Sequence, residues 1–259
     1  MLSKYNNIFD THAHYDDEQF EEDRDELIAF LPSLGVANII NCGCDLSSSL
    51  KSIELSEKYD FVYCAAGIHP SNITEKSDDE LNEIKKLYSN PKCIAIGEIG
   101  LEYHYNDIPK ERQLEVFEKQ LIVSKELDLP VIVHDREAHE DTMNLLRKYK
   151  PRGVVHCFSG SVEMAKEVIR LGMYIGLGGA VTFKNAKKPI EVAEYLPEDR
   201  LLLETDCPYM APVPHRGHRN SSDLIAFSAE KIAQVREVET QALIKKTKEN
   251  AERLFLNIV

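Results

Sequence analysis

The sequence of 259 residues is long enough for one large α/β barrel or two small domains, and its length demands no more than one core. Its 31 basic and 44 acidic residues give a formal charge of −13, which disfavours a broad electrostatic footprint on a nucleic-acid backbone. A polyanionic substrate would therefore need bound metal ions or a few arginines at the site.

The amino-terminal segment and the cysteines predict an unexported, cytoplasmic protein that has no membrane contact. The first residues lack the apolar core of a signal peptide, and no later run approaches the about 18 uncharged apolar residues of a membrane span. No Cys-x-x-Cys pair occurs, and most cysteines lie in apolar, strand-like runs, so we expect buried free thiols. The cysteines are Cys42, Cys44, Cys64, Cys93, Cys157 and Cys207.

Strand-like runs alternate with amphipathic, helix-like runs along the whole chain, which predicts a parallel sheet with helical crossovers. The predicted strands are residues 8–12, 36–42, 61–68, 93–98, 130–134, 153–157, 173–177 and 200–205. The helices predicted between them are 16–34, 47–59, 77–88, 109–127, 139–149, 162–171 and 186–195, and two more helices, 223–236 and 239–257, end the chain.

Eight β/α units in about 250 residues match the size of a closed barrel. We therefore predict the α/β class and a single-domain (β/α)8 TIM barrel over residues 1–259, with an additional C-terminal helix. An open, doubly wound sheet is the alternative. No Gly-x-Gly-x-x-Gly follows the first strand and no low-complexity linker divides the chain, so the barrel is favoured.

The first strand ends in a His-x-His pair. Successive side chains on a strand point to opposite faces, so we expect Asp10, His12 and His14 to share one face. Two imidazoles on one face can bind one cation. A lone His-x-His is more often a coincidence, and the metal hypothesis therefore depends on ligands from later strands.

Ionisable residues follow six of the eight predicted strands, at the edge where a barrel places its active site. Glu98 ends an apolar strand, where an unpaired carboxylate would be costly to desolvate, so it needs a metal or arginine partner. His134 and His156 could each be core histidines, but their equivalent places on consecutive strands favour ligation. His69, before Pro70, either shapes a turn or contacts substrate.

Four imidazoles and two carboxylates are too many for one tetrahedral ion and suit two divalent ions that share a bridging carboxylate. A mixed nitrogen and oxygen shell fits Zn²⁺ or Mn²⁺, and Mg²⁺ less naturally. Ions about 3.5–4 Å apart can activate a water and stabilise the leaving oxygen of a displacement at phosphorus.

These motifs, together with several glycine-rich ones, resemble those of the TatD family of metal-dependent deoxyribonucleases, within the amidohydrolase-like barrels. The resemblance spans nearly the whole chain. It rests on residues 10–14, Gly67-Ile68-His69-Pro70, residues 97–101, His134, residues 156–160, Phe183-Lys184-Asn185, Glu204-Thr205-Asp206 and residues 216–220.

The resemblance implies that His12, His14, Glu98 and Asp206 hold one ion, and that Glu98, His134 and His156 hold the other. It implies hydrolysis of DNA, as a 3′–5′ exonuclease on single strands. Glu98 is the predicted bridge, and Asp206 is predicted to ligate an ion and take a proton from the attacking water. His69, Arg216 and Arg219 are the predicted substrate contacts, and no oligomer is required.

Two positions depart from the family pattern. Glu102 stands where members commonly carry Asp, and His218 stands where they commonly carry Lys. The first exchange would shift a carboxylate outside the ligand set. The second removes a permanent cation and would make substrate affinity depend on pH.

Two other functions compete with the nuclease. Related barrels hydrolyse amides, esters or lactones with similar metal pairs, and D-aminoacyl-tRNA deacylation belongs to this class. No lysine for a bridging carbamate stands at the fourth strand, where Glu98 stands instead, and this favours the TatD-like arrangement. A non-catalytic binding protein on the same barrel is the third reading, and the complete ligand set argues against it.

Overall fold

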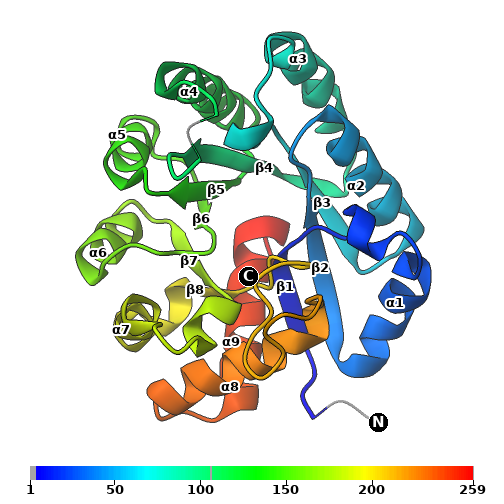
Figure 1. Ribbon diagram of the computed structural model, residues 1–259, viewed down its shortest axis with the longest axis vertical. Coiled ribbons are helices and arrows are strands. Elements are labelled where there is room, and N and C mark those ends of the chain that lie inside the picture. The colour runs from blue at the N-terminus through cyan, green and yellow to red at the C-terminus, as the bar shows by residue number, and fades with distance from the viewer. Residues whose placement is uncertain (1–3, 106, 259) are drawn as a thin grey trace.

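The protein is described by a computed structural model, which covers residues 4–105 and 107–258. Eight parallel strands follow one another in the order β1 to β8 and curl into a barrel, with helices around the outside (Figure 1). The predicted single-domain TIM barrel is therefore confirmed. The strands are β1 (Ile8–Ala13), β2 (Val36–Cys42), β3 (Val62–Ala66), β4 (Cys93–Glu102), β5 (Val131–Arg136), β6 (Gly153–Val155), β7 (Tyr174–Leu177) and β8 (Leu201–Leu203).

The barrel closes between the segment after β8 and the end of β1. An isolated bridge pairs Ala13 with Cys207, the amide of Asp206 donates to the carbonyl of His12 at 2.9 Å, and the amide of His14 donates to the carbonyl of Cys207 at 2.8 Å. We call this junction the seam. It joins the first and last predicted metal-binding segments.

The outer helices match the predicted amphipathic runs, and the longest, α4, buries Val116, Phe117 and Leu121 against the sheet side. Among the described residues, no helix combines the length and apolar composition needed to cross a membrane. The helices are α1 (Arg24–Phe30), α2 (Leu46–Lys58), α3 (Ser77–Leu87), α4 (Lys110–Leu127), α5 (His139–Tyr149), α6 (Val162–Arg170), α7 (Lys187–Tyr195), α8 (Ile225–Val235) and α9 (Thr240–Ala251).

The chain end covers the amino-terminal mouth of the barrel. Leu254 and Phe255, in the turn after α9, pack in one buried cluster with residues from the strand starts, including Phe9, Ile94 and Leu202. The additional C-terminal helix is thus confirmed. It covers the end of the barrel at which the strands start, whereas the cavity lies among residues at the carboxyl ends of the strands.

The predicted helix 16–34 is wrong, because the segment forms three short pieces: a 3-10 turn at Glu18–Phe20, α1 at Arg24–Phe30 and a second 3-10 turn at Leu31–Leu34. The guanidinium of Arg24 explains the break. It donates to the carbonyls of Tyr15 at 2.5 Å and Asp17 at 3.0 Å, which folds the chain back before α1.

The predicted end of the fourth strand at Glu98 is also wrong, since β4 continues to Glu102. The ladder with β5 shifts register between Ile96 and Ile99 and then resumes. Gly100 permits this continuation: its φ is 148°, and a Cβ there would lie 2.0 Å from the carbonyl oxygen of His134. Glu98 therefore sits inside the strand, at the irregularity.

Candidate metal centre

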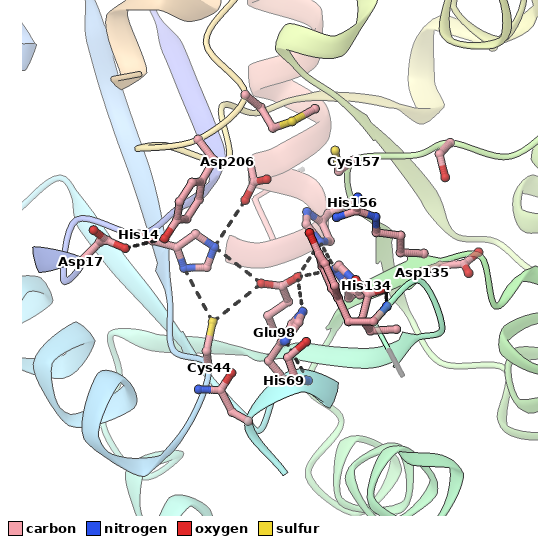
Figure 2. Close-up of a pocket in the computed structure, with 18 of the residues that line it drawn as sticks. His14, Asp17, Cys44, His69, Glu98, His134, Asp135, His156, Cys157 and Asp206 are labelled. Atoms are coloured by element: carbon pink, nitrogen blue, oxygen red, sulfur yellow. Dashed lines mark hydrogen bonds and ion pairs between the residues drawn. The ribbon is translucent and has the colours of Figure 1, made fainter. Parts of the chain in front are cut away.

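Four donor atoms from β1, β4 and the segment after β8 converge at the seam. The Nε2 atoms of His12 and His14 lie 3.0 Å apart, and each faces Glu98 Oε2, at 3.3 and 3.5 Å. Asp206 Oδ1 lies 3.7 Å from His12 Nε2. It also lies 3.4 Å from His14 Nε2, as Figure 2 shows. We call these atoms the first donor group.

The end of β2 orients both histidines of this group. The carbonyl oxygen of Cys42 lies 2.9 Å from His14 Nδ1, and the Sγ atom of Cys42 lies 3.4 Å from His12 Nδ1. A carbonyl can only accept, so Nδ1 of His14 carries a proton, and Nε2 is the nitrogen that faces the site. The sequence analysis assigned Cys42 to the core and missed this role.

A second set of donors surrounds the other oxygen of the same carboxylate. Glu98 Oε1 lies 2.8 Å from His134 Nδ1 and 2.7 Å from His156 Nε2, and these two nitrogens are 3.3 Å apart. His69 Nε2 is 3.5 Å from Oε1 (Figure 2). We call these atoms the second donor group, and Glu98 links it to the first.

Glu102 lies behind the second donor group. Its Oε2 is 3.2 Å from His134 Nε2, while its Oε1 accepts from the amide of His104 at 2.7 Å. A carboxylate on the far nitrogen of a ligating histidine fixes the ring and raises its basicity. The prediction that residue 102 lies outside the ligand set agrees with this position.

Both donor groups fit a divalent ion. Bonds of about 2.1 Å to a tetrahedral ion place its ligands about 3.4 Å apart. In the first donor group, the contacts that involve a nitrogen of His12 or His14 span 3.0–3.7 Å. In the second, the contacts of Glu98 Oε1 and of the His134–His156 pair span 2.7–3.5 Å. Imidazole nitrogens mixed with carboxylate oxygens are the donors that Zn²⁺ and Mn²⁺ accept.

The pKa values divide the histidines into two kinds. Burial lowers the pKa of His12 to about 4 and that of His69 to about 3, so both are neutral. Burial also opposes charge on His134, but hydrogen bonds to Glu102 and Glu98 outweigh it and raise the pKa to about 9. For Glu98, burial opposes ionisation, yet the surrounding histidines hold its pKa well below the usual range.

The donor groups lie at the floor of a cavity of about 850 Å³ at the carboxyl ends of the strands. His14, His69, Glu98, His134, His156 and Asp206 all contribute to its wall (Figure 2). The structure thus brings together the six predicted metal ligands, with His12 buried just beneath the wall.

The comparisons with known proteins agree with this arrangement. The family model described as "TatD related DNase" matches residues 9–256. The chain belongs to the TatD family. The recognition made from the motifs is therefore confirmed, and the protein is a hydrolase of this family.

Relatives of this TatD-family chain are similar over almost their full length. The "uncharacterized metal-dependent hydrolase YabD" of Bacillus subtilis is 43% identical over 96% of this chain and 98% of its own. The "3'-5' ssDNA/RNA exonuclease TatD" of Cronobacter sakazakii is 34% identical over 96% and 98%. The crystal structure of the TatD homologue YjjV from Escherichia coli K12 matches with a TM-score of 0.90 at 31% identity, covering 98% of this chain and 99% of that one.

Two predicted substrate contacts of this TatD-family chain lie away from the described cavity wall. Arg219 is held by Asp23, with nitrogen–oxygen distances of 2.5 and 2.7 Å. Arg216 lies over the ring of Phe183, 4.0 Å from its centroid, and both arginines are exposed. Their role in substrate binding stays a prediction, as does that of His69, which does line the cavity.

Asp10 does not join the histidines, contrary to the expected shared face. Its carboxylate accepts from Thr205 Oγ1 at 2.6 Å and from Ser222 Oγ at 2.7 Å, and also from the amides of His12 and Thr205. The reason is a register irregularity in β1 between Asp10 and Ala13, which breaks the simple alternation.

Glu204 was named from the sequence only as part of the Glu204-Thr205-Asp206 motif, with no role of its own, and Cys44 was not expected at the site. Glu204 is buried beside Gly176, where a Cβ would lie 2.1 Å from its Oε2, and burial raises its pKa to about 7. Cys44 was expected in the core but lines the cavity, with Sγ 3.8 Å from Glu98 Oε2. The Glu204-Thr205-Asp206 motif was the signal for Glu204, and nothing in the sequence pointed to Cys44.

Proposed function

We propose that this chain is a divalent-metal-dependent phosphodiesterase that hydrolyses DNA, as a 3′–5′ exonuclease on single strands, with one ion in each donor group. The observation that carries the proposal is Glu98, whose two oxygens are divided between two sets of imidazoles. A bridging carboxylate of this kind suits a two-ion site for displacement at phosphorus.

In this proposal, Glu98 and Asp206 are the catalytic residues. Glu98 contributes one oxygen to each donor group and so fixes the position of one group relative to the other. Burial opposes charge on Asp206, but its hydrogen bond to His14 lowers its pKa, so it stays ionised at neutral pH and can accept the proton of the attacking water. Two bound ions of Zn²⁺, Mn²⁺ or Mg²⁺ would supply positive charge for the phosphate oxygens and would acidify that water.

The size of the cavity supports a strand end as the substrate. A volume of about 850 Å³ lies in the range of small-molecule pockets, which admit a nucleotide or two but not an intact duplex. The relative from Cronobacter sakazakii carries the name of a 3′–5′ single-strand exonuclease. All proposed ligands come from one chain, so the proposed activity needs no oligomer. We also propose that the protein acts in the cytoplasm.

One observation favours a second candidate, the hydrolysis of a neutral ester, amide or lactone. Carboxylates dominate the described cavity wall, and they would repel a polyanion until metal ions bind. The carboxylates are Asp16, Asp17, Asp45, Glu98, Glu102, Asp135 and Asp206.

The decisive experiment is digestion of a single-stranded oligonucleotide by the purified protein, labelled at the 5′ end in one reaction and at the 3′ end in another. Metal-stripped protein is supplied with Mg²⁺, Mn²⁺ or Zn²⁺, and a lactone and an aryl ester are tested in parallel. We expect a descending ladder from the 5′-labelled strand and early release of the 3′ label as mononucleotide.

Asp206→Asn is the inactive control, and Glu194→Gln, an exposed acid on α7, is the matched neutral one. Hydrolysis of the lactone or ester with no nucleotide product would replace the proposed function by the second candidate. Binding of the oligonucleotide without turnover of any substrate would leave a binding protein.

A further inference from the structure

The cavity contains a single permanent cation among the described residues that line it. Seven carboxylates stand in the wall against one arginine, Arg136. Among the described lining residues, only Arg136 offers a guanidinium or ammonium group to the phosphate oxygens of an anionic substrate. The position of Arg136 therefore bears on which substrates can enter.

Arg136 reaches the cavity from the end of β5. It stands two residues after His134, and in the ladder it pairs with Glu102 of β4. Residues two apart on a strand share a face, so Arg136 projects on the same side as the second donor group. Both side chains line the cavity, with the exposed Arg136 toward its mouth.

The guanidinium of Arg136 is uncommitted, unlike the two arginines of the 216–219 loop. Among the described residues, no carboxylate lies within 4.0 Å of it, whereas Arg219 is paired with Asp23 at 2.5 Å. Arg216 already lies over Phe183 and donates to the carbonyl of Ala211 at 3.5 Å. Arg136 thus retains its hydrogen-bond donors for a ligand.

A chain of contacts positions Arg136. Its guanidinium carbon lies 5.1 Å from the ring centroid of Tyr105, which also lines the cavity and is 52% exposed. Tyr105 packs edge-on against His104 at 4.8 Å, and His104 Nδ1 lies 2.8 Å from Glu137 Oε1. A planar guanidinium resting on an aromatic face keeps its edge free for a planar or tetrahedral anion.

We propose that Arg136 is the substrate-binding residue that selects an anionic ester for this site, by donating hydrogen bonds to non-bridging phosphate oxygens, and that Tyr105 is its positioning residue. The proposal rests on the proposed function for the polynucleotide, but it concerns the charge of the substrate and not the length of its chain. A guanidinium can form two parallel hydrogen bonds to a phosphate, which adds orientation as well as affinity.

The test compares Arg136→Gln with Arg152→Gln, a matched exposed arginine whose partners are Asp128 and Asn257. The substrates are the monoanion methyl p-nitrophenyl phosphate and the neutral p-nitrophenyl acetate. We expect Arg136→Gln to raise KM for the anion by on the order of tenfold with little change in kcat, and to leave the neutral ester unaffected. Arg152→Gln should change neither.

A binding measurement removes turnover from the test. In the Asp206→Asn background, a fluorescent single-stranded oligonucleotide is titrated at several salt concentrations, and thymidine monophosphate is titrated by calorimetry. Loss of one phosphate contact should lower the slope of log affinity against log salt by about 0.7. Tyr105→Phe should retain the salt slope of the parent protein. Tyr105→Leu should raise KM for methyl p-nitrophenyl phosphate and leave KM for p-nitrophenyl acetate unchanged.

The outcomes separate the two proposals. If the parent cleaves oligonucleotides and Arg136→Gln changes neither KM nor salt slope, the role of Arg136 is wrong and the nuclease stands. If the parent hydrolyses only the small anionic ester, with the expected effect of Arg136→Gln, the nuclease is wrong and the role of Arg136 stands. If the protein turns over none of these substrates, and the parent and Arg136→Gln bind thymidine monophosphate with equal affinity, the proposed role of Arg136 is also wrong.

Discussion

The two donor groups share Glu98 but are built on different kinds of structure. The second lies around the ends of β3 to β6, where each strand pairs with the next through a main-chain ladder, although the ladder of β4 with β5 shifts register between Ile96 and Ile99. The first lies at the seam between β1 and the segment after β8. Among the described residues, the β-pairing there is limited to one bridge, between Ala13 and Cys207.

Side chains replace the missing ladder at the seam. The carboxylate of Asp10 binds Thr205 and Ser222, and the hydroxyl of Ser222 lies 2.8 Å from that of Tyr15. Thr205 immediately precedes Asp206, and the amide of His12 donates to Asp10. The comparison teaches that the first donor group depends on a buried polar network and the second on the sheet itself, so the two should fail separately.

The largest effect should come from Glu98→Ala, because this residue alone belongs to both groups. We expect activity to fall by on the order of 10³-fold or more, since several kcal/mol of transition-state stabilisation are lost with the ions. Metal analysis should find both ions depleted while the melting temperature of the metal-free protein stays near that of the parent. An unchanged rate with full metal occupancy would refute the bridging role.

Asp206→Asn should disable the first donor group alone. The amide keeps the shape but cannot take a proton, so we expect the single-turnover rate to fall by on the order of 10²-fold or more while substrate affinity changes little. Metal analysis should find the second ion retained. A raised substrate dissociation constant with an unchanged single-turnover rate would contradict the role as base.

Asp10→Ala should weaken the first donor group without touching a ligand. Removing the carboxylate leaves Thr205 and Ser222 without their buried acceptor, which should cost about 3 kcal/mol of unfolding free energy. Affinity for the first ion should fall on the order of 10- to 100-fold, as for other residues that orient ligands. Calorimetric titration with Zn²⁺ and chemical denaturation provide the two measurements.

The counterpart variant, Glu102→Gln, sharpens the same comparison. It removes the carboxylate beside His134 Nε2 and should weaken the second ion, leaving the first in place. If Asp10→Ala and Glu102→Gln lowered the affinity of both ions equally, the two groups would be one cooperative unit and the distinction drawn from the seam would fail.

The last expected effect needs no substitution and is a pH dependence of metal binding. In the metal-free protein the proton on His134, whose pKa is raised to about 9, must leave before an ion binds. Affinity for the second ion should therefore rise about tenfold per pH unit up to about pH 9 and level off above it. Activity should fall on the acidic side of its pH profile, and this fall, the acid limb, should move to lower pH as the free metal concentration increases.

His218→Lys is the control for this pH dependence, since the substitution restores the permanent charge that the family commonly carries at this position. The metal-sensitive acid limb should survive it. An acid limb that stays in place at every metal concentration would mean that the histidine ligands do not limit the reaction at low pH.

The sequence by itself determined the barrel and the chemical content of its active edge. Alternating strand-like and amphipathic runs require helices to cover a parallel sheet, and a closed barrel gathers the residues that follow its strands at one mouth. These positions, together with the resemblance to the TatD family, allowed six ligands to be named: His12, His14, Glu98, His134, His156 and Asp206. Buried imidazoles and carboxylates at strand ends are costly unless they bind something.

The tertiary structure alone decided how these donors divide and what supports them. The division of the two Glu98 oxygens depends on the register shift in β4, and the place of Asp10 depends on an irregularity in β1. Neither shift leaves a mark in the local pattern. Asp10 meets Ser222 212 residues later in the chain, because barrel closure, not neighbourhood in sequence, sets such contacts.

The arginines illustrate the same limit. The sequence does not show the partners of Arg136, Arg216 and Arg219, and the resemblance singled out only the latter two as substrate contacts. Only the fold pairs Arg219 with Asp23, lays Arg216 on Phe183, and leaves Arg136 at the cavity. Residue type and spacing fix what chemistry is available, whereas charge pairing across the folded chain fixes which side chains remain free to perform it.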